Sequence, residues 1–381
     1  MSSLTAHELR SLVTSQGRLK LSIEEAPVPD PGADEVVVRI EAAPLNPSDI
    51  INLLGSADVS TLRASGGPGG PAAEADVPAE RLAALAGRLD RPIPVGNEGA
   101  GVVVQAGASA QALLGRTVAI APFGGSYATL RTVKARDCVV LPEGTSARDG
   151  ASAFVNPLTA LGMVETLRRE GHTALVHTAA ASNLGQMLNR LCLADGVPLV
   201  NVVRSPAQAD VLRAQGATHV LDSSAESFKD ALVEAIAQTG ATLGFDAIGG
   251  GRMAATILAA MEQVLRRKLA AYSRYGSPVH KQVYIYGRLD PGPRIIEGDL
   301  GMAWGVCGWL LTFFLAKLSS DEVASLRARV AREIKTTFAS RYTAEISLAQ
   351  AVSPDVIRAY AKHATGEKYL VVPNAPDARR D

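Results

Sequence analysis

The pattern of apolar and polar positions changes near residue 156. Before it, short apolar runs are separated by glycine, proline and aspartate, as is typical of antiparallel strands joined by turns. We therefore predict a β-rich, barrel-like domain in roughly the first 150 residues. Its strands are expected at residues 34–45, 99–107, 115–125, 126–133 and 137–144.

Residues 55–91 interrupt this pattern. A stretch rich in Gly, Pro and Ala at 64–80 predicts a flexible loop, and residues 81–90 have the composition of a helix. A long loop in a compact domain is either a lid over a pocket or a tolerated insertion.

After residue 156, strand-like segments alternate with segments long enough to be helices. Strands joined by helix-length crossovers predict a parallel, doubly wound sheet. The expected strands are residues 173–178, 197–203, 217–222, 241–249 and 281–287, and the expected helices are 183–196, 206–216, 227–240 and 252–272. The tail returns to a mixture of helix and strand, and its apolar segment 369–373 is expected to rejoin the first domain.

One apolar run, residues 302–316, predicts a buried strand and helix, with a contact between subunits as a further role. It has roughly 15 residues, fewer than the roughly 20 that cross a bilayer. We therefore expect no membrane span.

Charge and cysteine content narrow the function classes. Lys and Arg (38) balance Asp and Glu (38), which argues against a general electrostatic grip on nucleic acid or on an anionic membrane. The three cysteines lie far apart, as expected for reduced thiols, and the first 18 residues lack the apolar core of a signal peptide. Together these features predict a cytoplasmic protein.

The segment "HTAAASNLG" (residues 177–185) stands where a dinucleotide-binding unit places its phosphate loop, but it holds one glycine. Phosphates bind there to N–H groups at the start of a helix. Gly185 is expected where the helix packs on the sheet, Ser182 replaces a usual glycine with a small donor, and Asn183 tolerates the left-handed conformation. From the loop alone, a packed βαβ unit without nucleotide is an equally good interpretation.

The end of the next strand favours a nucleotide. Arg204 lies 19 positions beyond Gly185, where an NAD-binding enzyme carries an acidic residue, and a basic side chain suits the 2′-phosphate of NADP. The alternative is a solvated arginine at a strand end. Later strand-end loops, at the carboxyl edge where such sheets bind ligands, add four candidate cofactor residues: Gly249, Tyr286, Gly287 and Arg288.

Four segments resemble one family in their order along the chain. They are "LNPSDIINLLG" (45–55), "PIPVGNEGAGVVVQAG" (92–107), "VNPLTALGMVE" (155–165) and "NVVRS" (201–205). The chain resembles the medium-chain dehydrogenase/reductases, in their zinc-free quinone reductase and enoyl-thioester reductase branch, from about residue 32 to 373. The motifs are specific to the family and weak as to substrate.

The resemblance implies an α/β architecture of two domains. A GroES-like, β-rich catalytic domain would comprise residues 1–156 and 317–381, around an NADP-binding Rossmann domain at 157–316. It also implies an active site in the cleft between them, NADPH as the hydride donor, and a homodimer.

A metal site is not expected. Zinc-dependent relatives carry a Gly-His-Glu motif and a four-cysteine lobe, but here Asn97 stands in the place of the histidine and only three scattered cysteines occur. Zinc needs three or four converging ligands.

The resemblance also assigns roles to individual residues. It implies that Asn46 and Thr159 lie beside the nicotinamide and its phosphates, the alternatives being a turn residue before Pro47 and a helix cap. The remaining cofactor residues are backbone donors to the pyrophosphate at Ser182, Asn183, Leu184 and Gly185, Arg204 on the 2′-phosphate, and His363 and Lys368 either as further 2′-phosphate ligands or as ordinary surface charges.

One departure from the family concerns proton donation. Enoyl-thioester reductases place a tyrosine two residues after the glycine at position 55, where this chain has Ala57. Tyr127 is the next tyrosine, and either faces the cleft as a donor or packs as a strand aromatic.

These observations predict an NADPH-dependent oxidoreductase that passes hydride to a small hydrophobic acceptor, a quinone or an activated alkene. The alternative is a non-catalytic NADPH-binding sensor or structural protein of the same fold.

Overall fold

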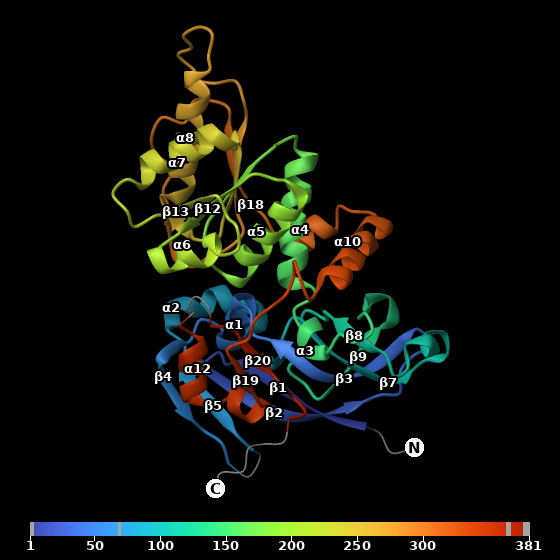
Figure 1. Cartoon of the computed structure of the whole chain (residues 1–381). Coiled ribbons are helices and arrows are strands. Elements are labelled where there is room, and N and C mark those ends of the chain that lie inside the picture. Colours follow the sequence, from blue (N-terminus) through green and yellow to red (C-terminus); the bar gives the residue numbers. More distant parts are fainter. Residues whose placement is uncertain (1–3, 68–69, 363–366, 376–381) are drawn as a thin grey trace. The chain divides into compact units, whose positions relative to one another are not determined.

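The computed structural model describes residues 4–67, 70–362 and 367–375. The chain divides into two compact units, each with its own sheets and apolar core (Figure 1). Unit 1 comprises Met1–Val155 and Arg327–Asp381, and unit 2 comprises Asn156–Leu326. The mixed α/β class expected from the sequence is confirmed.

Unit 1 is built on two sheets. One has the strand order β4-β5-β2-β1-β6, and the other has the order β10-β8-β7-β3-β20-β19, with β9 also paired to β3. The strands are β1 (Leu4–Val13), β2 (Arg18–Val28), β3 (Glu35–Pro44), β4 (Asp58–Ala64), β5 (Ala72–Asp76), β6 (Ile93–Pro94), β7 (Gly99–Ala106), β8 (Thr117–Ile120), β9 (Leu130–Lys134), β10 (Val139–Val140), β19 (Ala344–Ile346) and β20 (Tyr369–Val371). Because β20 pairs with β3, segments from both parts of the chain form one sheet, as the apolar segment 369–373 predicts.

Short helices complete unit 1. They are α1 (Pro47–Leu54), α2 (Ala79–Leu82), η1 (Ala83–Arg88), η2 (Ala108–Leu113), η3 (Ala135–Asp137), α3 (Ala147–Gly150), α11 (Leu348–Ala351) and α12 (Pro354–Tyr360). Helix α10 (Ser320–Glu333) contains the boundary between the two units.

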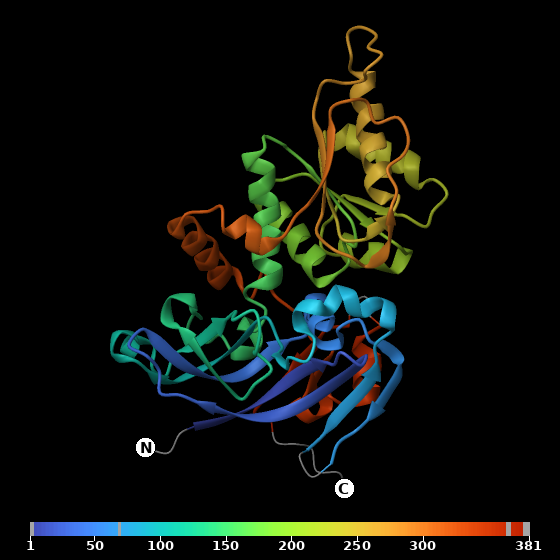
Figure 2. The ribbon, with the colours of Figure 1, turned by 180° about the vertical axis from the view of Figure 1, so that it is seen from behind.

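The prediction of a flexible loop at 64–80 is wrong in part. β4 and β5 form an antiparallel hairpin that extends the first sheet through β2 (Figure 2). In β5, buried Ala73 and Ala75 alternate with Glu74 and Asp76, which is the period of a half-buried strand. Small alanines and the flanking glycines hide this period in the sequence. The residues that follow are helical, as expected.

Unit 2 is a six-stranded, fully parallel sheet with the order β13-β12-β11-β14-β16-β18. In chain order this is 3-2-1-4-5-6, the doubly wound arrangement whose order reverses between β11 and β14. The elements are α4 (Val155–Arg169), β11 (Leu175–His177), α5 (Asn183–Asp195), β12 (Leu199–Val203), α6 (Pro206–Arg213), β13 (His219–Asp222), α7 (Phe228–Thr239), β14 (Leu243–Asp246), α8 (Met253–Arg267), β16 (Lys281–Ile285) and β18 (Trp304–Gly308). A small parallel pair, β15 (Gly249–Gly251) and β17 (Asp290–Arg294), joins the loops after β14 and β16.

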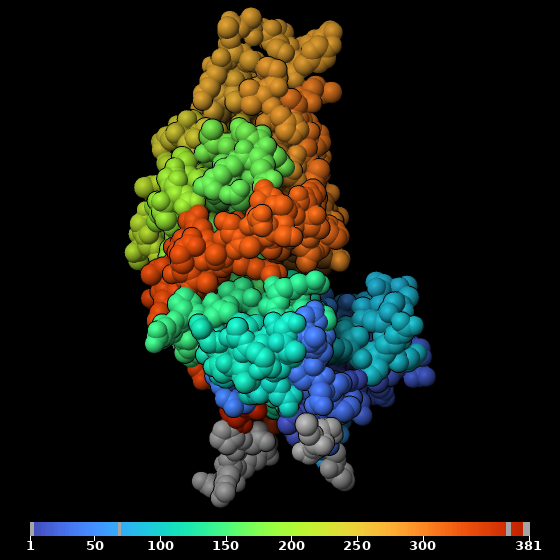
Figure 3. Space-filling model, turned by 90° about the vertical axis from the view of Figure 1, so that its right-hand side faces the viewer, coloured from blue at the N-terminus to red at the C-terminus, as the bar shows by residue number. Residues whose placement is uncertain are grey.

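The 302–316 run is less buried than its composition predicts. It forms strand β18 and helix α9 (Leu311–Leu315), but Met302 is 76% exposed and Phe313 is 69% exposed. β18 is an edge strand, so one side of it lacks a neighbouring strand in the sheet order. Residues 269–280 extend beyond α8 as the gold surface of Figure 3, with Tyr272 93% exposed. Across the described residues, no helix has both the length and the apolar character needed to cross a membrane.

Candidate functional site

The turn between β11 and α5 lies at the carboxyl end of the first strand of unit 2, beside the reversal in strand order. Ser182 caps α5: its hydroxyl accepts a hydrogen bond from the backbone N–H of Gly185 at 3.1 Å. Ala179 takes a positive φ of 50°, a conformation that glycine adopts without strain, whereas Asn183, expected to tolerate it, is the first residue of α5. The helix therefore begins with its N–H groups at the edge where such sheets bind ligands.

Gly185 allows the helix to approach the turn. A Cβ on this residue would lie 2.2 Å from the carbonyl oxygen of Ala180, closer than any side chain tolerates. This close packing of the first helical turn on the loop is what a pyrophosphate-binding turn requires. The turn fits a dinucleotide even though it has one glycine.

Arg204 follows β12 at the same edge of the sheet. Its side chain is exposed, and its backbone N–H donates to the Gln208 side chain at 3.1 Å. Ser205 next to it caps α6. The guanidinium is accessible at the position where the sequence places a 2′-phosphate ligand.

The carboxylate of Asp246, the last residue of β14, links the turn after β14 to the residue that follows β11. It accepts hydrogen bonds from the Thr178 hydroxyl at 2.7 Å and from the backbone N–H of Ile248 and Gly249 at 3.0 and 3.1 Å. Gly249 and Gly287 have no room for a Cβ, because each would meet backbone oxygen of the facing turn within 2.6 Å. Sequence reasoning missed Asp246, although an acidic residue at the end of an apolar strand was a usable signal.

Tyr286 and Arg288 occupy the turn after β16. Arg288 is exposed. The Tyr286 hydroxyl lies 2.8 Å from Nε2 of His177, the last residue of β11. His177 is completely buried, and burial lowers its pKa to about 3, so the imidazole is neutral. His177 was not among the predicted site residues.

Thr159 lies inside α4 and is buried. The interpretation of Thr159 as a helix cap is therefore wrong, because α4 begins at Val155.

Asn46 in unit 1 caps helix α1 and is buried. Its amide nitrogen donates to Glu98 at 2.8 Å, and its backbone N–H donates to Asp49 at 2.9 Å. Glu98 also accepts from the backbone N–H of Phe154 and Val155 at 2.8 and 2.9 Å. Glu98 is thus the centre of a buried polar cluster, which the sequence did not reveal because the "GNEG" segment suggested only a comparison with zinc ligands.

The carboxylates of this cluster have perturbed pKa values. Burial, reinforced by the nearby Glu98 charge, raises the pKa of Asp49 to about 7, against hydrogen bonds from the Asn46 and Asn97 backbones. Burial likewise raises the pKa of Glu98, against the field of Lys368. Both carboxyl groups are therefore easier to protonate than exposed ones.

Lys368 belongs to the same buried cluster, so the interpretation as a surface charge is wrong for it. It is 7% exposed, and its ammonium donates to the Ser152 hydroxyl at 2.8 Å. Ser152 lies 2.8 Å from the hydroxyl of Tyr342. Burial lowers the pKa of Lys368 to about 8, opposed by the charges of Glu98 and Asp49. His363 lies outside the described residues.

Tyr127 is packed rather than open to a cleft. It is 1% exposed, its hydroxyl donates to the Pro44 carbonyl at 3.0 Å, and burial raises its pKa well above the ordinary value. The expectation of a cleft-facing phenol is corrected by this burial. Ala57, at the position of the family tyrosine, is also buried.

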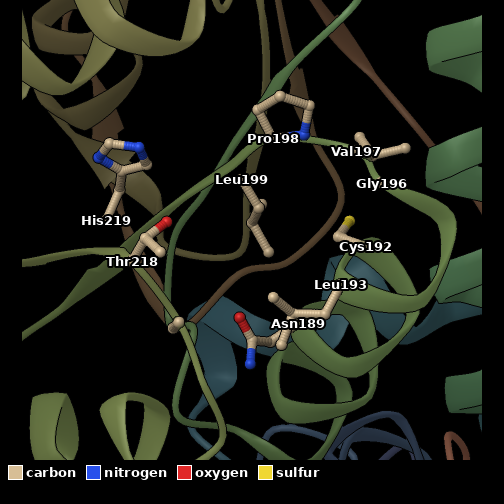
Figure 4. A pocket seen from close by; sticks show the side chains of 10 residues that line it. Asn189, Cys192, Leu193, Gly196, Val197, Pro198, Leu199, Thr218 and His219 are labelled. Carbon is tan, nitrogen blue, oxygen red and sulfur yellow. The ribbon is translucent and has the colours of Figure 1, made fainter.

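Among the described residues, no group of three or more His, Cys, Asp and Glu side chains is placed to hold a metal ion. A pocket of about 290 Å³ opens at the amino ends of β12 and β13, lined by residues that include Asn189, Pro198 and His219 (Figure 4). This pocket lies at the sheet edge opposite the β11–α5 turn, so it does not coincide with the candidate dinucleotide site.

Comparison with known proteins matches this architecture. A Mesorhizobium loti protein named as an NADPH:quinone reductase superposes with a TM-score of 0.73 and 26% identity, covering 98% of this chain and 100% of that one. The mitochondrial enoyl-[acyl-carrier-protein] reductase of Xenopus tropicalis is 29% identical over 210 residues. The chain is thus similar, in sequence and in fold, to reductases of the medium-chain dehydrogenase/reductase superfamily.

Other relatives are more distant in sequence or aligned over only part of their length. The rat synaptic vesicle membrane protein VAT-1 homolog is 27% identical over 236 residues, which cover 61% of this chain and 51% of the relative; for the Xenopus enzyme the shares are 53% and 51%. The chain thus spans about half the length of the curated relatives it matches. A complex of Etr1p with NADP and crotonyl-CoA, at 20% identity and a TM-score of 0.67, shares the fold. No family model matches the chain.

Proposed function

We propose that this protein is an NADPH-dependent oxidoreductase of the medium-chain dehydrogenase/reductase type that transfers hydride to a quinone or an activated alkene without zinc. The observation that carries the proposal is the β11–α5 turn, which packs tightly against Gly185 beside the point where the strand order of the sheet reverses. Arg204 is exposed at the end of the next strand. Bound NADPH supplies the hydride. The protein binds and orients the cofactor and the acceptor, and it excludes water from the reaction.

In this proposal the residues of unit 2 hold the cofactor. The start of α5, at Ser182, Asn183, Leu184 and Gly185, faces the pyrophosphate, where backbone N–H groups and the helix dipole favour anions. Arg204 pairs with the 2′-phosphate through charge-assisted hydrogen bonds. The turns carrying Gly249, Tyr286, Gly287 and Arg288 complete the site, and the NADPH- and NADP-named relatives support this choice of cofactor.

The roles of Asn46, Thr159, His363 and Lys368 stay predictions from the family resemblance. The Asn46 amide nitrogen donates to Glu98 at 2.8 Å. The proposal of a zinc-free reaction rests on Asn97, whose amide donates to the Ser48 hydroxyl at 3.0 Å where a zinc enzyme has histidine.

A non-catalytic NADPH-binding protein is the second candidate. Two observations favour it: Ala57 stands at the position of the family tyrosine, and the Tyr127 hydroxyl is occupied by Pro44. A sensor or structural protein needs only the cofactor site of unit 2.

One experiment separates the two functions. The purified protein is mixed with NADPH and a panel of quinones and enones, and loss of reduced-nicotinamide absorbance is followed alongside NADPH binding by fluorescence. Turnover with any acceptor supports the oxidoreductase. Binding without turnover on every acceptor indicates the sensor, and absence of NADPH binding contradicts both.

We also propose a homodimer and a cytoplasmic location, in line with the family resemblance and the cysteine content. The mass in solution, measured by light scattering, tests the dimer.

A further inference from the structure

His177 and Tyr286 form a hydrogen-bonded, stacked pair at the carboxyl edge of the unit 2 sheet. His177 ends β11, and Tyr286 directly follows β16, two strands away in the sheet. Nε2 of the imidazole lies 2.8 Å from the phenol oxygen, and the ring centroids are 5.7 Å apart at an interplanar angle of 17°. The histidine is completely buried and the tyrosine is half-buried.

The hydrogen bond between them has a preferred direction. The neutral imidazole carries one N–H, on either Nδ1 or Nε2. Within the described residues, Nδ1 of His177 is buried without a hydrogen-bond partner. A buried N–H without an acceptor is rarer in proteins than an acceptor with an unused lone pair. The proton therefore resides on Nε2, which donates to the oxygen of Tyr286.

This direction leaves the hydrogen of the Tyr286 hydroxyl without a role in the pair. Burial and the charge of Asp246 raise the pKa of Tyr286, so the phenol remains protonated at physiological pH. With its oxygen accepting from His177, the phenol is oriented as a donor to another group. The acceptor of this hydrogen therefore lies outside the His177–Tyr286 pair.

The strand order indicates which half of a dinucleotide lies near Tyr286. In the 3-2-1-4-5-6 arrangement, one mononucleotide half belongs to strands β11, β12 and β13 and the other to β14, β16 and β18. Arg204 follows β12 and marks the adenosine half under the proposed function. Tyr286 follows β16, so it belongs to the nicotinamide half, where the hydride leaves.

We propose that Tyr286, oriented by His177, donates its hydroxyl hydrogen to the carbonyl oxygen of the hydride acceptor. It would replace the family tyrosine, whose position is taken by Ala57 in this chain. The inference rests on the proposed function and names an acceptor class, a quinone or an enone. The acceptor gains the hydride with its electron pair, and negative charge collects on the carbonyl oxygen. The O–H proton of Tyr286 then passes to that oxygen. The phenolate accepts a hydrogen bond from His177 Nε2–H and regains its proton from water.

The nicotinamide carboxamide also carries a carbonyl oxygen, so the experiment must separate the two sources. Tyr286→Phe removes only the hydroxyl, and Tyr284→Phe is the matched control: its hydroxyl, two residues earlier, donates to Glu170 at 2.6 Å. We expect Tyr286→Phe to lower kcat with quinones and enones on the order of 100-fold and to leave the Kd of NADPH within about 3-fold. Tyr284→Phe should change neither quantity.

Each other outcome has a defined meaning. A higher Kd for NADPH with unchanged kcat would assign the phenol to the carboxamide and overturn the proposal. Unchanged kcat and Kd would overturn it as well. Absence of turnover by the wild-type chain contradicts the proposed function itself, whereas wild-type turnover that survives Tyr286→Phe contradicts only the role of Tyr286.

His177 is a positioning residue in this scheme, and its role has two tests. In the cofactor-free protein, ¹⁵N spectra of labelled histidine should show His177 neutral with the proton on Nε2; a proton on Nδ1 would contradict the inferred direction. His177→Phe should lower kcat roughly 10-fold in the wild-type background and have no effect in Tyr286→Phe. Additive losses would mean that His177 acts on structure and not through the phenol.

Discussion

Unit 2 presents its candidate residues on turns of small side chains, whereas unit 1 buries its candidates among charges. At the β11–α5 turn the chain excludes Cβ atoms and offers backbone groups, and its one buried imidazole is neutral. In unit 1, Glu98, Asp49 and Lys368 are all buried with shifted pKa values. Under the proposed function, unit 2 recognises a cofactor of fixed form by the shape of its turns, whereas the charged cluster in the apolar core of unit 1 must be held by hydrogen bonds.

The strongest test of the unit 2 side is Gly185→Val. A side chain there collides with the Ala180 carbonyl, so the turn must open, and we expect NADPH binding to be abolished. Fluorescence titration measures the effect, with circular dichroism confirming the fold. Gly308→Ala is the control, because a Cβ there meets nothing within 4 Å. Normal binding by the valine variant would contradict the assignment of this turn.

The unit 1 side predicts a pH effect on stability. Because the pKa of Lys368 falls from 10.5 to about 8 on folding, the unfolded chain binds more protons at this residue between these values. The free energy of unfolding should therefore rise with pH across this window, by about 3 kcal/mol at most. Urea unfolding at pH 8 and pH 10 measures the gain.

Lys368→Met should lose that gain, because the substitute has no titrating group. Lys335→Met removes an exposed lysine that donates to the Gly144 carbonyl, and it should keep the gain. An equal pH dependence in wild type and Lys368→Met would show that the burial of Lys368 carries no proton linkage.

Cofactor preference is the next largest expected effect. Arg204→Ala removes a charge-assisted contact worth about 1.5–3 kcal/mol, so NADPH should bind roughly 10- to 150-fold more weakly while NADH is unaffected. Arg213→Ala, an exposed arginine paired with Asp210 on α6, serves as the control. Equal losses of affinity for both cofactors would contradict the assignment of Arg204 to the 2′-phosphate.

The smallest effect concerns the centre of the buried cluster. Glu98→Gln keeps the size of the side chain but turns one acceptor into a donor that faces backbone N–H groups or Asn46. We expect a loss of about 1–2 kcal/mol in the free energy of unfolding. Glu345→Gln breaks an exposed pair with Arg148 and should cost less than about 1 kcal/mol. Equal losses of unfolding free energy would mean that the buried Glu98 contributes no more to stability than the exposed Glu345.

The parts predicted from the sequence are those fixed by neighbours along the chain. Strand β11, the capping Ser182 and Gly185 belong to one strand–turn–helix unit, and its periodicity and small residues can be recognised in a short stretch of sequence. The β4–β5 hairpin was missed, since alanines supply too little hydrophobic contrast to show a period of two. The exposure of residues 302–316 was missed because composition does not distinguish an edge strand from a central one.

The sequence by itself determined the alternation of elements, the small-residue turn between β11 and α5, and the basic residue after β12, because these depend on local periodicity and spacing. Only the tertiary structure decided the polar clusters. Asn46 meets Glu98 across 52 positions, His177 meets Tyr286 across 109, and Lys368 meets Ser152 across 216. Burial turns these ordinary residues into a neutral histidine, a protonatable aspartate and a lysine of lowered pKa, and burial is a property of the fold.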